Sequence, residues 1–502
     1  MREPLWSNLS RRRFVGLAAS AAGVAAALPG SAQEPSAHGA RVVVATDGSG
    51  DFGPQTPGTA TSGIQEALEA VHAAGGGAVL LRRGVYLVDH TSPPSPDARR
   101  FGCGLQSIGL YGDVTLRGEG LDQTIIRTAA ECNTNALLGW QTSRVCLEDL
   151  TVDGARLNAG YGIAIFGMGT SFSDVYLRRV KVTGFGGSAI GIAGGRRVTI
   201  EQCCGLNSAI GLELGSPSVD YQVLHCTACG CTNGTLIFDP ADQYNEAGNA
   251  RPRVVGGVYD GEGRASGVAL WDCWEPALIG VTAVRGVTTN LQISSSHRPT
   301  ITTPVGGGLM EACLAEASVG SAAGRYGIGA CQDGVRVLGC SVVGNEDLGV
   351  LAAPDPGGRI GVFGCAFGAG EGDRQRYAIV PQGEGVALHA GSNLWDGRGD
   401  GFLGNPAALA ASASRLTGNA GFNPVGLLTP PEMPTSGDFA PNPHPFPVEV
   451  HVHSGRVRTM RKRDARGREA LVAAHASNVR LEPGEAVAIS YSRPPAWTWF
   501  GL

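Results

Sequence analysis

Acidic side chains follow short apolar runs at several places in this chain. In GTLIFDPADQYNE, Asp239 follows Thr235 and the apolar residues 236–238. Pro240 has no amide hydrogen for a β-ladder, so a strand ending there would leave Asp239 at its rim. Asp272 follows a comparable run in GVALWDC, and Glu213 lies within AIGLELG. Carboxylates at a rim can move protons, bind calcium or accept hydrogen bonds from hydroxyl groups.

These runs belong to a ladder of similar segments, which reads YGIAIFG, AIGIAGG, AIGLELG, GTLIFDP, GVALWDC, NLQISSS, YGIGACQ and LGVLAAP. We take the inward residues to be Ile192, Leu212, Ile237, Leu270 and Ile293. The alignment then predicts one outward column of Ala193, Glu213, Phe238, Trp271 and Ser294, with Asp239 and Asp272 both at strand ends. Stacked coils lie about 4.8 Å apart, so we expect Asp239 and Asp272 in neighbouring coils and Glu213 one coil below. Aromatic faces beside paired acids suit carbohydrate, so Phe238 and Trp271 are candidate sugar-binding residues.

The coil that carries Asp239 also contains an insertion. Cys226 to Val258 takes 32 residues where neighbouring coils take 23, and the extra residues form QYNEAGNARPR. Loops beside a rigid scaffold often build binding sites, which makes Asp242 and Tyr244 candidate binding residues. The alternative is that Asp239 and Asp242 form turn hydrogen bonds after the strand.

A second set of repeats indicates the scaffold. Six segments can be aligned: VYLRRVKVTG, VTIEQCCGLN, YQVLHCTACG, ALIGVTAVRG, VRVLGCSVVG and RIGVFGCAFG. When Val258 and Cys313 are added as further members of the set, neighbouring members lie 22–32 residues apart in the sequence. The shared position is occupied by Val180, Cys203, Cys226, Val281, Cys340 and Cys365. Such a period, with alternating apolar residues and no helical stripe, is typical of a solenoid of stacked β-coils. We expect these residues to point inward as a ladder, and a third strand in each coil is not placed by the pattern.

Upstream of the repeats, SGIQEALEAVHAAGGGAVLLRRGVYLV predicts an amphipathic helix and a strand. Ser62 is the expected cap, with Gln65 three residues later, and Ile64, Leu68 and Val71 share a face. With DGSGDFG before it and VTLRGEGLDQTIIR after it, this region resembles the N-terminal part of the pectate-lyase-like superfamily, and the resemblance covers roughly residues 43–400. It implies an all-β fold, a right-handed parallel β-helix closed by the helix, and an extracytoplasmic polysaccharide as the usual ligand.

The composition changes after residue 405. We expect the β-helix over residues 41–405, a proline-rich linker over 406–445 and a small β-domain over 446–502, whose two strand patterns have turns at Ser454-Gly455 and Pro483-Gly484. Its ending resembles the terminal module attached to other β-helix proteins, including ones of phage type. Trp497, Trp499 and Phe500 are expected to fill the core of that domain, and the alternative is a sugar-stacking platform.

The first 32 residues resemble a twin-arginine export signal. Ser10-Arg11-Arg12-Arg13-Phe14-Val15 precedes a mild apolar stretch and small residues before Gln33. The mature protein is therefore expected in the periplasm or outside the cell. Removing residues 1–32 changes the formal net charge from −5 to −8, which argues against a nucleic-acid partner. No later apolar run predicts a membrane span.

Thirteen cysteines, all between Cys103 and Cys365, are expected to be free thiols, because a twin-arginine substrate folds before export in a reducing compartment. Cys226, Cys229 and Cys231 have no second Cys/His pair at a suitable spacing, which argues against a structural zinc site.

FDPAD also resembles the DPHD motif of β-helical mannuronan C5-epimerases. Asp239, Pro240 and Asp242 match, whereas Ala241 stands where that family has histidine. The polygalacturonase series NTD, DD and GHG is not found in the sequence. The chain is therefore expected to act on a polysaccharide, a uronate-containing or other acidic glycan.

Three interpretations of the chemistry stay open. In a lyase, Glu213, Asp239 and Asp272 would hold calcium against a uronate carboxylate, with Arg298 or Arg253 near the proton to be removed. In a hydrolase, Asp239 and Asp272 would be the acid and its partner. His297 in SSSHRP could serve either, although a lone loop histidine is often only solvated. The third interpretation is a non-catalytic β-helix that binds glycans or forms a surface structure.

Overall fold

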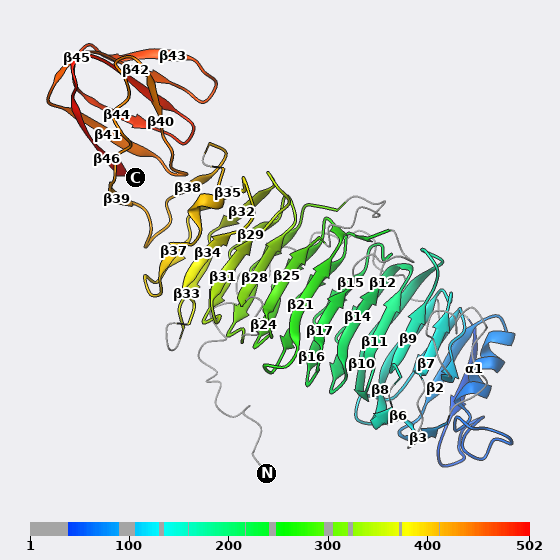
Figure 1. Ribbon diagram of the computed structural model, residues 1–502. Helices are drawn as coiled ribbons and strands as arrows, with labels where there is room; N and C mark the ends of the chain where they lie inside the picture. The colour runs from blue at the N-terminus through cyan, green and yellow to red at the C-terminus, as the bar shows by residue number, and fades with distance from the viewer. Residues whose placement is uncertain are drawn as a thin grey trace.

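The computed structural model describes residues 39–89, 106–129, 135–158, 160–215, 217–239, 247–295, 305–319, 325–370, 374–410 and 412–502. It is a parallel β-solenoid of about 10 turns with only 3% helix. Helix α1 (Ile64–Ala73) lies at one end of the solenoid, and a small antiparallel β-domain lies at the other (Figure 1). In the described part of the chain, no helix is both long and apolar enough to cross a membrane. The predicted β-helix is confirmed.

One strand of each coil belongs to a twelve-stranded parallel sheet, which we call sheet I. Its strands within the described residues are β4 (Gln106–Gly109), β7 (Asn135–Trp140), β9 (Ile163–Phe166), β11 (Ser188–Ala193), β14 (Ile210–Gly215), β17 (Gly234–Phe238), β21 (Ser266–Trp271), β25 (Thr289–Ser294), β28 (Tyr326–Cys331), β31 (Leu348–Ala352), β34 (Tyr377–Pro381) and β37 (Gly401–Leu403).

The other strands of the coils form a continuous bent sheet, sheet II. Its strands are β1 (Ala40–Val44), β2 (Gly77–Leu81), β3 (Gly84–Val88), β5 (Val114–Arg117), β6 (Thr124–Thr128), β8 (Val145–Asn158), β10 (Phe172–Phe185), β12 (Gly195–Glu201), β13 (Cys204–Leu206), β15 (Gln222–Leu224), β16 (Thr227–Cys229), β19 (Arg253–Val255), β20 (Val258–Asp260), β23 (Ala277–Ile279), β24 (Thr282–Val284), β26 (Leu309–Glu311), β27 (Leu314–Glu316), β29 (Arg336–Leu338), β30 (Ser341–Val343), β32 (Arg359–Phe363), β33 (Ala366–Gly368), β35 (Ala387–Gly391), β36 (Leu394–Trp395) and β38 (Arg415–Thr417).

The third strand that the sequence did not place lies inside the repeats themselves. VTIEQCCGLN contains both β12 and β13, and Gln202 turns the chain between them with a φ of 53°. Equivalent left-handed corners occur at His225, Gly256 and Gly280. The left-handed conformation is costly for residues other than glycine and does not continue a β-strand, so each of these residues marks a bend from one strand to the next.

The inward cysteine ladder is confirmed. Cys203, Cys226, Cys340 and Cys365 are buried. Cys313 lies opposite Cys340 in the coil that precedes it, and Cys365 lies opposite Cys340 in the coil that follows. The thiols donate to main-chain carbonyls one coil earlier, as from Cys226 Sγ to Ile200 O at 3.3 Å. Asn393 and Asn419 continue the ladder, with Asn393 Nδ2 donating to Val362 O at 3.0 Å. The inserted position at Val258 is wrong by one residue, because Val258 pairs with Thr227 and Gly257 therefore lies opposite Cys226.

Helix α1 covers the first coils with Ile64, Ala67, Leu68 and Val71, all of which are buried. The expected cap is wrong, because Ser62 Oγ donates to Leu87 O at 2.6 Å. The hydroxyl oxygen of Thr61 instead accepts the Gln65 amide hydrogen at 3.0 Å.

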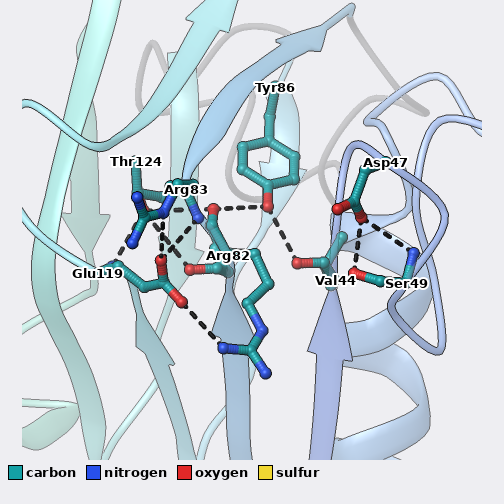
Figure 2. A network of polar contacts seen from close by, with 9 residues as sticks. Val44, Asp47, Ser49, Arg82, Arg83, Tyr86, Glu119 and Thr124 are labelled. Carbon is teal, nitrogen blue, oxygen red and sulfur yellow. Dashed lines mark hydrogen bonds and ion pairs between the residues drawn. The ribbon is translucent and has the colours of Figure 1, made fainter.

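The first coils are also joined by polar contacts (Figure 2). Tyr86 Oη lies 2.9 Å from Val44 O and 2.8 Å from Arg82 O, bridging β1 to the turn after β2. Glu119 accepts hydrogen bonds from Arg82 Nη1 and from the Arg83 amide, each at 3.1 Å. These contacts fix the end of the solenoid that α1 closes.

The C-terminal domain consists of two four-stranded antiparallel sheets. One contains β39 (Gly426–Leu428), β46 (Ala496–Gly501), β41 (Val448–His453) and β44 (Asn478–Leu481), and the other contains β40 (Phe439–Pro441), β45 (Ala486–Arg493), β42 (Arg456–Arg463) and β43 (Glu469–Ala473). Trp497 and Trp499 are buried with ring centroids 5.2 Å apart, so they fill this core as expected. The segment expected as a linker carries β38 of the solenoid as well as β39 and β40, and the exact domain boundary stays a prediction.

Candidate functional site

The outward face of sheet I differs from the column that the sequence predicts. The strand pairing sets Ile192, Leu214, Phe238, Leu270 and Ile293 at one inward position. Glu213 lies opposite Gly191 and Ile237, so it belongs to a different outward position from Trp271. The predicted register is therefore wrong by two residues at Leu212 and by one at Ile237.

Two outward columns replace the predicted one, and we call them the inner column and the rim column. The inner column contains Leu138, Ala164, Gly191, Glu213, Ile237, Ala269, Gln292 and Gly329. The rim column contains Trp140, Phe166, Ala193, Gly215, Trp271, Ser294 and Cys331. Phe238 pairs with Leu214 and Leu270, so Asp239, the next residue, stands between Gly215 and Trp271 in the rim column. The main-chain N–H of Asp239 donates to Leu214 O at 2.8 Å.

The Asp239 side chain is half-buried and leans toward the preceding coil. A Cβ atom at Gly215 would lie 3.9 Å from Asp239 Oδ2 and 2.5 Å from Ala193 Cβ. A Cβ atom at position 215 would therefore collide with Ala193, whereas it would only touch the Asp239 carboxylate, which lies toward Gly215. Trp271, half-buried, occupies the same column in the following coil.

Two predicted surface residues are buried. Phe238 points inward and packs edge-on against Tyr221, with ring centroids 6.3 Å apart, so it cannot stack on a bound sugar. Asp272 is fully buried just after β21, in a left-handed conformation with φ of 50°. Asp239 is thus paired in position with Trp271 and not with Asp272, which corrects the expected pair of acids.

A buried amide holds the main chain around Asp239. Asn249, in β18 (Asn249–Ala250), donates from Nδ2 to Asp239 O at 2.9 Å and to Trp271 O at 3.2 Å. Its Oδ1 accepts a hydrogen bond from Ser218 Oγ at 2.6 Å, and its main-chain N–H donates to Asp272 O at 3.0 Å. One side chain therefore fixes the backbone of three successive coils at the rim.

Both columns also contain polar side chains. Glu213 is half-buried, and its Oε2 accepts a hydrogen bond from Ser188 Oγ. On the other side of Trp271, Gln292 Nε2 donates to Ser294 Oγ at 3.1 Å. With a strand rise of about 3.3 Å per residue and a coil spacing of about 4.8 Å, the Cα atoms of Glu213 and Asp239 are about 8 Å apart.

A ladder of alternating charge runs along the corner that follows sheet I. Asp113, Arg144, Asp174, Arg197, Asp220 and Arg251 occupy this corner in successive coils, all in the left-handed conformation. Arg197 forms two hydrogen bonds of 2.8 Å with Asp174, and Arg251 binds Asp220 in the same bidentate way. The hydrogen bonds from Arg197 are the main reason why the pKa of Asp174 lies below its usual range. This ladder secures the corner into which the segment after Asp239 returns.

The other site residues predicted from the sequence do not lie beside Asp239 in the described part of the chain. Asp242, Tyr244, His297 and Arg298 lie outside the described residues. Arg253 begins β19 in sheet II, so it does not share the face of Asp239. Among the described side chains, no three or more histidine, cysteine or acidic groups are gathered as a metal site. Asp272 is fully buried and does not join Glu213 and Asp239 in the calcium site of the lyase interpretation.

Sequence reasoning missed Asn249 and the charge ladder. The spacing of Asp113, Arg144, Asp174, Arg197, Asp220 and Arg251 equals the successive coil lengths, so the alternation of sign at that interval was a readable signal. Asn249 carried no such signal, because it follows an insertion that interrupts the period.

Comparison with known proteins shows a partial relationship. No model of a known protein family matches the chain. Mannuronan C5-epimerase AlgE6 of Azotobacter vinelandii is 37% identical over 116 residues, which is 22% of this chain and 12% of that enzyme. AlgE4 of the same organism is 31% identical over 146 residues, or 26% of this chain and 25% of the enzyme. Part of this chain is therefore homologous to mannuronan C5-epimerases. The chain spans only a tenth to a quarter of the length of AlgE1, AlgE6 and AlgE4.

Solved structures with some likeness have low identity. The AlgE6 A-module of A. vinelandii matches with a TM-score of 0.43 and 16% identity, over 74% of this chain and 99% of that one. The tailspike of E. coli bacteriophage HK620, solved with a pentasaccharide, matches with a TM-score of 0.49 and 11% identity, over 92% of this chain and 93% of that one.

Proposed function

We propose that this chain is an exported enzyme that acts on a uronate-containing polysaccharide at the rim column of sheet I, with Asp239 as an acid–base group. The observation that carries the proposal is the position of Asp239 between Gly215 and Trp271 in the rim column, with Oδ2 of its carboxylate lying toward Gly215. Trp271 would stack on a sugar ring, and Glu213 would accept hydrogen bonds from sugar hydroxyls.

The partial homology supports a uronate as substrate. The epimerases that match are named for action at C5 of mannuronan. Removing the proton from C5, next to the uronate carboxyl group, is the first step of both epimerisation and elimination. Epimerisation ends when a proton returns to C5 from the opposite face. Elimination ends when the bond between C4 and the bridging oxygen breaks and that oxygen takes a proton.

Asp239 suits one of these proton transfers because it is half-buried yet borders the outward face. Asn249 holds its main chain, which would keep the carboxylate in place during the reaction. Ala241 stands where the epimerase motif has histidine, so the partner of Asp239 must come from another residue. Arg298 and His297 are our proposed candidates for that partner.

The test is a set of assays on polymannuronate, polyguluronate, pectate and a neutral glucan, each with and without calcium. Absorbance of unsaturated products reports elimination, reducing ends without unsaturation report hydrolysis, and deuterium incorporated at C5 from heavy water reports epimerisation. We expect a response on a uronate polymer and none on the glucan. Turnover of the glucan alone would contradict the uronate assignment.

A non-catalytic glycan-binding protein is the second candidate. Ala241, in place of the motif histidine, is the observation that favours it. Retardation of the protein in gels that contain polymannuronate, with no product in any assay, would support this candidate. It would also remove the catalytic role of Asp239.

A further inference from the structure

Three aromatic side chains lie on the outward face of sheet I, toward the helix-capped end of the solenoid. Trp140 in β7 and Phe166 in β9 are neighbours in the rim column, and Tyr161 precedes β9. All three are half-buried and pack over Leu138 and Ala164 of the inner column. We call Trp140, Tyr161 and Phe166 the aromatic cluster.

The rings lie close to the sheet surface. Tyr161 and Phe166 meet edge to face, with centroids 5.5 Å apart. A Cβ atom at Gly191, one coil further on, would lie 2.8 Å from Tyr161 Cδ1 and 3.3 Å from Phe166 Cζ. The two rings therefore extend over the next coil, toward Asp239, and use the space that Gly191 leaves open.

Only small side chains separate the aromatic cluster from Asp239 in the rim column. Ala193 and Gly215 fill the two intervening positions, and Asp239 Oδ2 leans back over Gly215. The rim column therefore has aromatic rings at one end, two small residues in the middle, and the Asp239 carboxylate followed by the Trp271 indole at the other end. Phe166 is three coils from Asp239 and Trp140 is four, which is about 14 and 19 Å.

We propose that the aromatic cluster is a distal subsite that binds sugar rings of the same polysaccharide chain whose bond reacts near Asp239. This inference rests on the proposed function, and it adds the direction of the polymer, which runs along the solenoid axis from Asp239 toward α1. Sugar rings present apolar faces that pack on aromatic rings. Among the described residues, only Ala193 and Gly215 stand between the two places in the rim column. The subsite makes affinity depend on chain length, because a short oligosaccharide at Asp239 does not reach Trp140.

The first test compares a long and a short ligand. Trp140→Ala and Phe166→Ala should each weaken the binding of polymannuronate by about 3- to 10-fold, measured by retardation in gels that contain the polymer. Binding of the mannuronate trisaccharide, measured by titration calorimetry, should stay as in the wild type. Phe363→Ala is the matched control, because Phe363 is an exposed aromatic residue in sheet II.

The second test leaves the aromatic packing intact. Ala193→Trp places a bulky side chain in the path between the aromatic cluster and Asp239, and should reduce polymer binding by about 10-fold or more while reducing trisaccharide binding less. Ala366→Trp, at an exposed position of sheet II, should change neither. This variant keeps the inference falsifiable even if removal of a ring lowers stability.

The outcomes separate the subsite from the proposed function. If polymannuronate retards the wild type and all variants equally, the distal subsite is wrong and the proposed function stands. An equal loss of polymer and trisaccharide binding would likewise overturn the subsite, because it would show damage to the site at Asp239. If no polymannuronate binds or reacts with the wild type, the proposed function fails for this polymer and the subsite fails with it.

Discussion

Asp239 and Trp271 occupy the same outward position in successive coils, and a single buried amide, Asn249, hydrogen-bonds the carbonyl oxygens of both. The alignment of a carboxylate with an indole is therefore fixed by the main chain and does not depend on the side chains alone. Asp272, the residue after Trp271, is buried beneath this surface.

Replacing Asp239 should reduce activity, whereas replacing Asp272 should reduce stability. Asp239→Asn should reduce activity on a responsive polysaccharide by about 10²-fold or more, with a melting temperature near that of the wild type. Asp272→Ala should lower the free energy of unfolding by about 1–3 kcal/mol, because it removes a buried polar group from its partners. Kinetics and denaturant unfolding check both, and Glu384→Gln, at an exposed turn, is the control. A fully active Asp239→Asn enzyme would reject the assigned role.

Removing the amide of Asn249 should affect stability and activity together. Asn249→Ala leaves the Asp239 and Trp271 carbonyls and the Ser218 hydroxyl without this partner, which should cost about 1–3 kcal/mol in unfolding free energy. Activity should fall by about 10-fold or more as Asp239 loses its fixed position. Asn478→Ala, at an exposed position of β44, should change neither quantity. Wild-type kinetics in Asn249→Ala would show that Asp239 does not need this support.

Acid should destabilise the solenoid through the charge ladder. Hydrogen bonds from arginine lower the pKa of Asp113 and Asp174 in the folded protein, so their ionised forms stabilise the fold fully above the unfolded pKa, about 3.9. That contribution is lost as pH falls through the lower folded pKa. The melting temperature should therefore drop below about pH 4, and the drop should be shallower in Asp174→Asn than in the exposed control Asp438→Asn. Parallel curves for both variants would contradict a stabilising ladder.

The cysteines should titrate as free thiols only after unfolding. All eleven cysteines in the described residues are free. Burial raises the pKa of Cys231 and Cys331 to about 12, so the reactive thiolate is scarce at neutral pH. We expect slow alkylation of the native protein and rapid alkylation of the denatured, unreduced protein. Near-zero thiol content after denaturation would refute this expectation.

The parallel β-helix, the helix that closes it and the inward cysteine ladder could all be predicted from the amino-acid sequence. These features repeat with the coil, so each copy of the pattern supports the same assignment, as Cys203, Cys226, Cys340 and Cys365 illustrate. The burial of Trp499 in the small domain agrees with the expectation that aromatic residues at a chain end fill the core of their own domain.

The outward-facing residues of sheet I could not be predicted in the same way. At the start of β17, the successive residues Thr235 and Leu236 are both fully buried, so simple alternation counted from that end fails. Ile237 and Phe238 are both apolar, and nothing in their types tells which one points inward. A slip of one residue moves a side chain to the other face of a strand, which is why Phe238 went to the core and Asp239 aligned with Trp271.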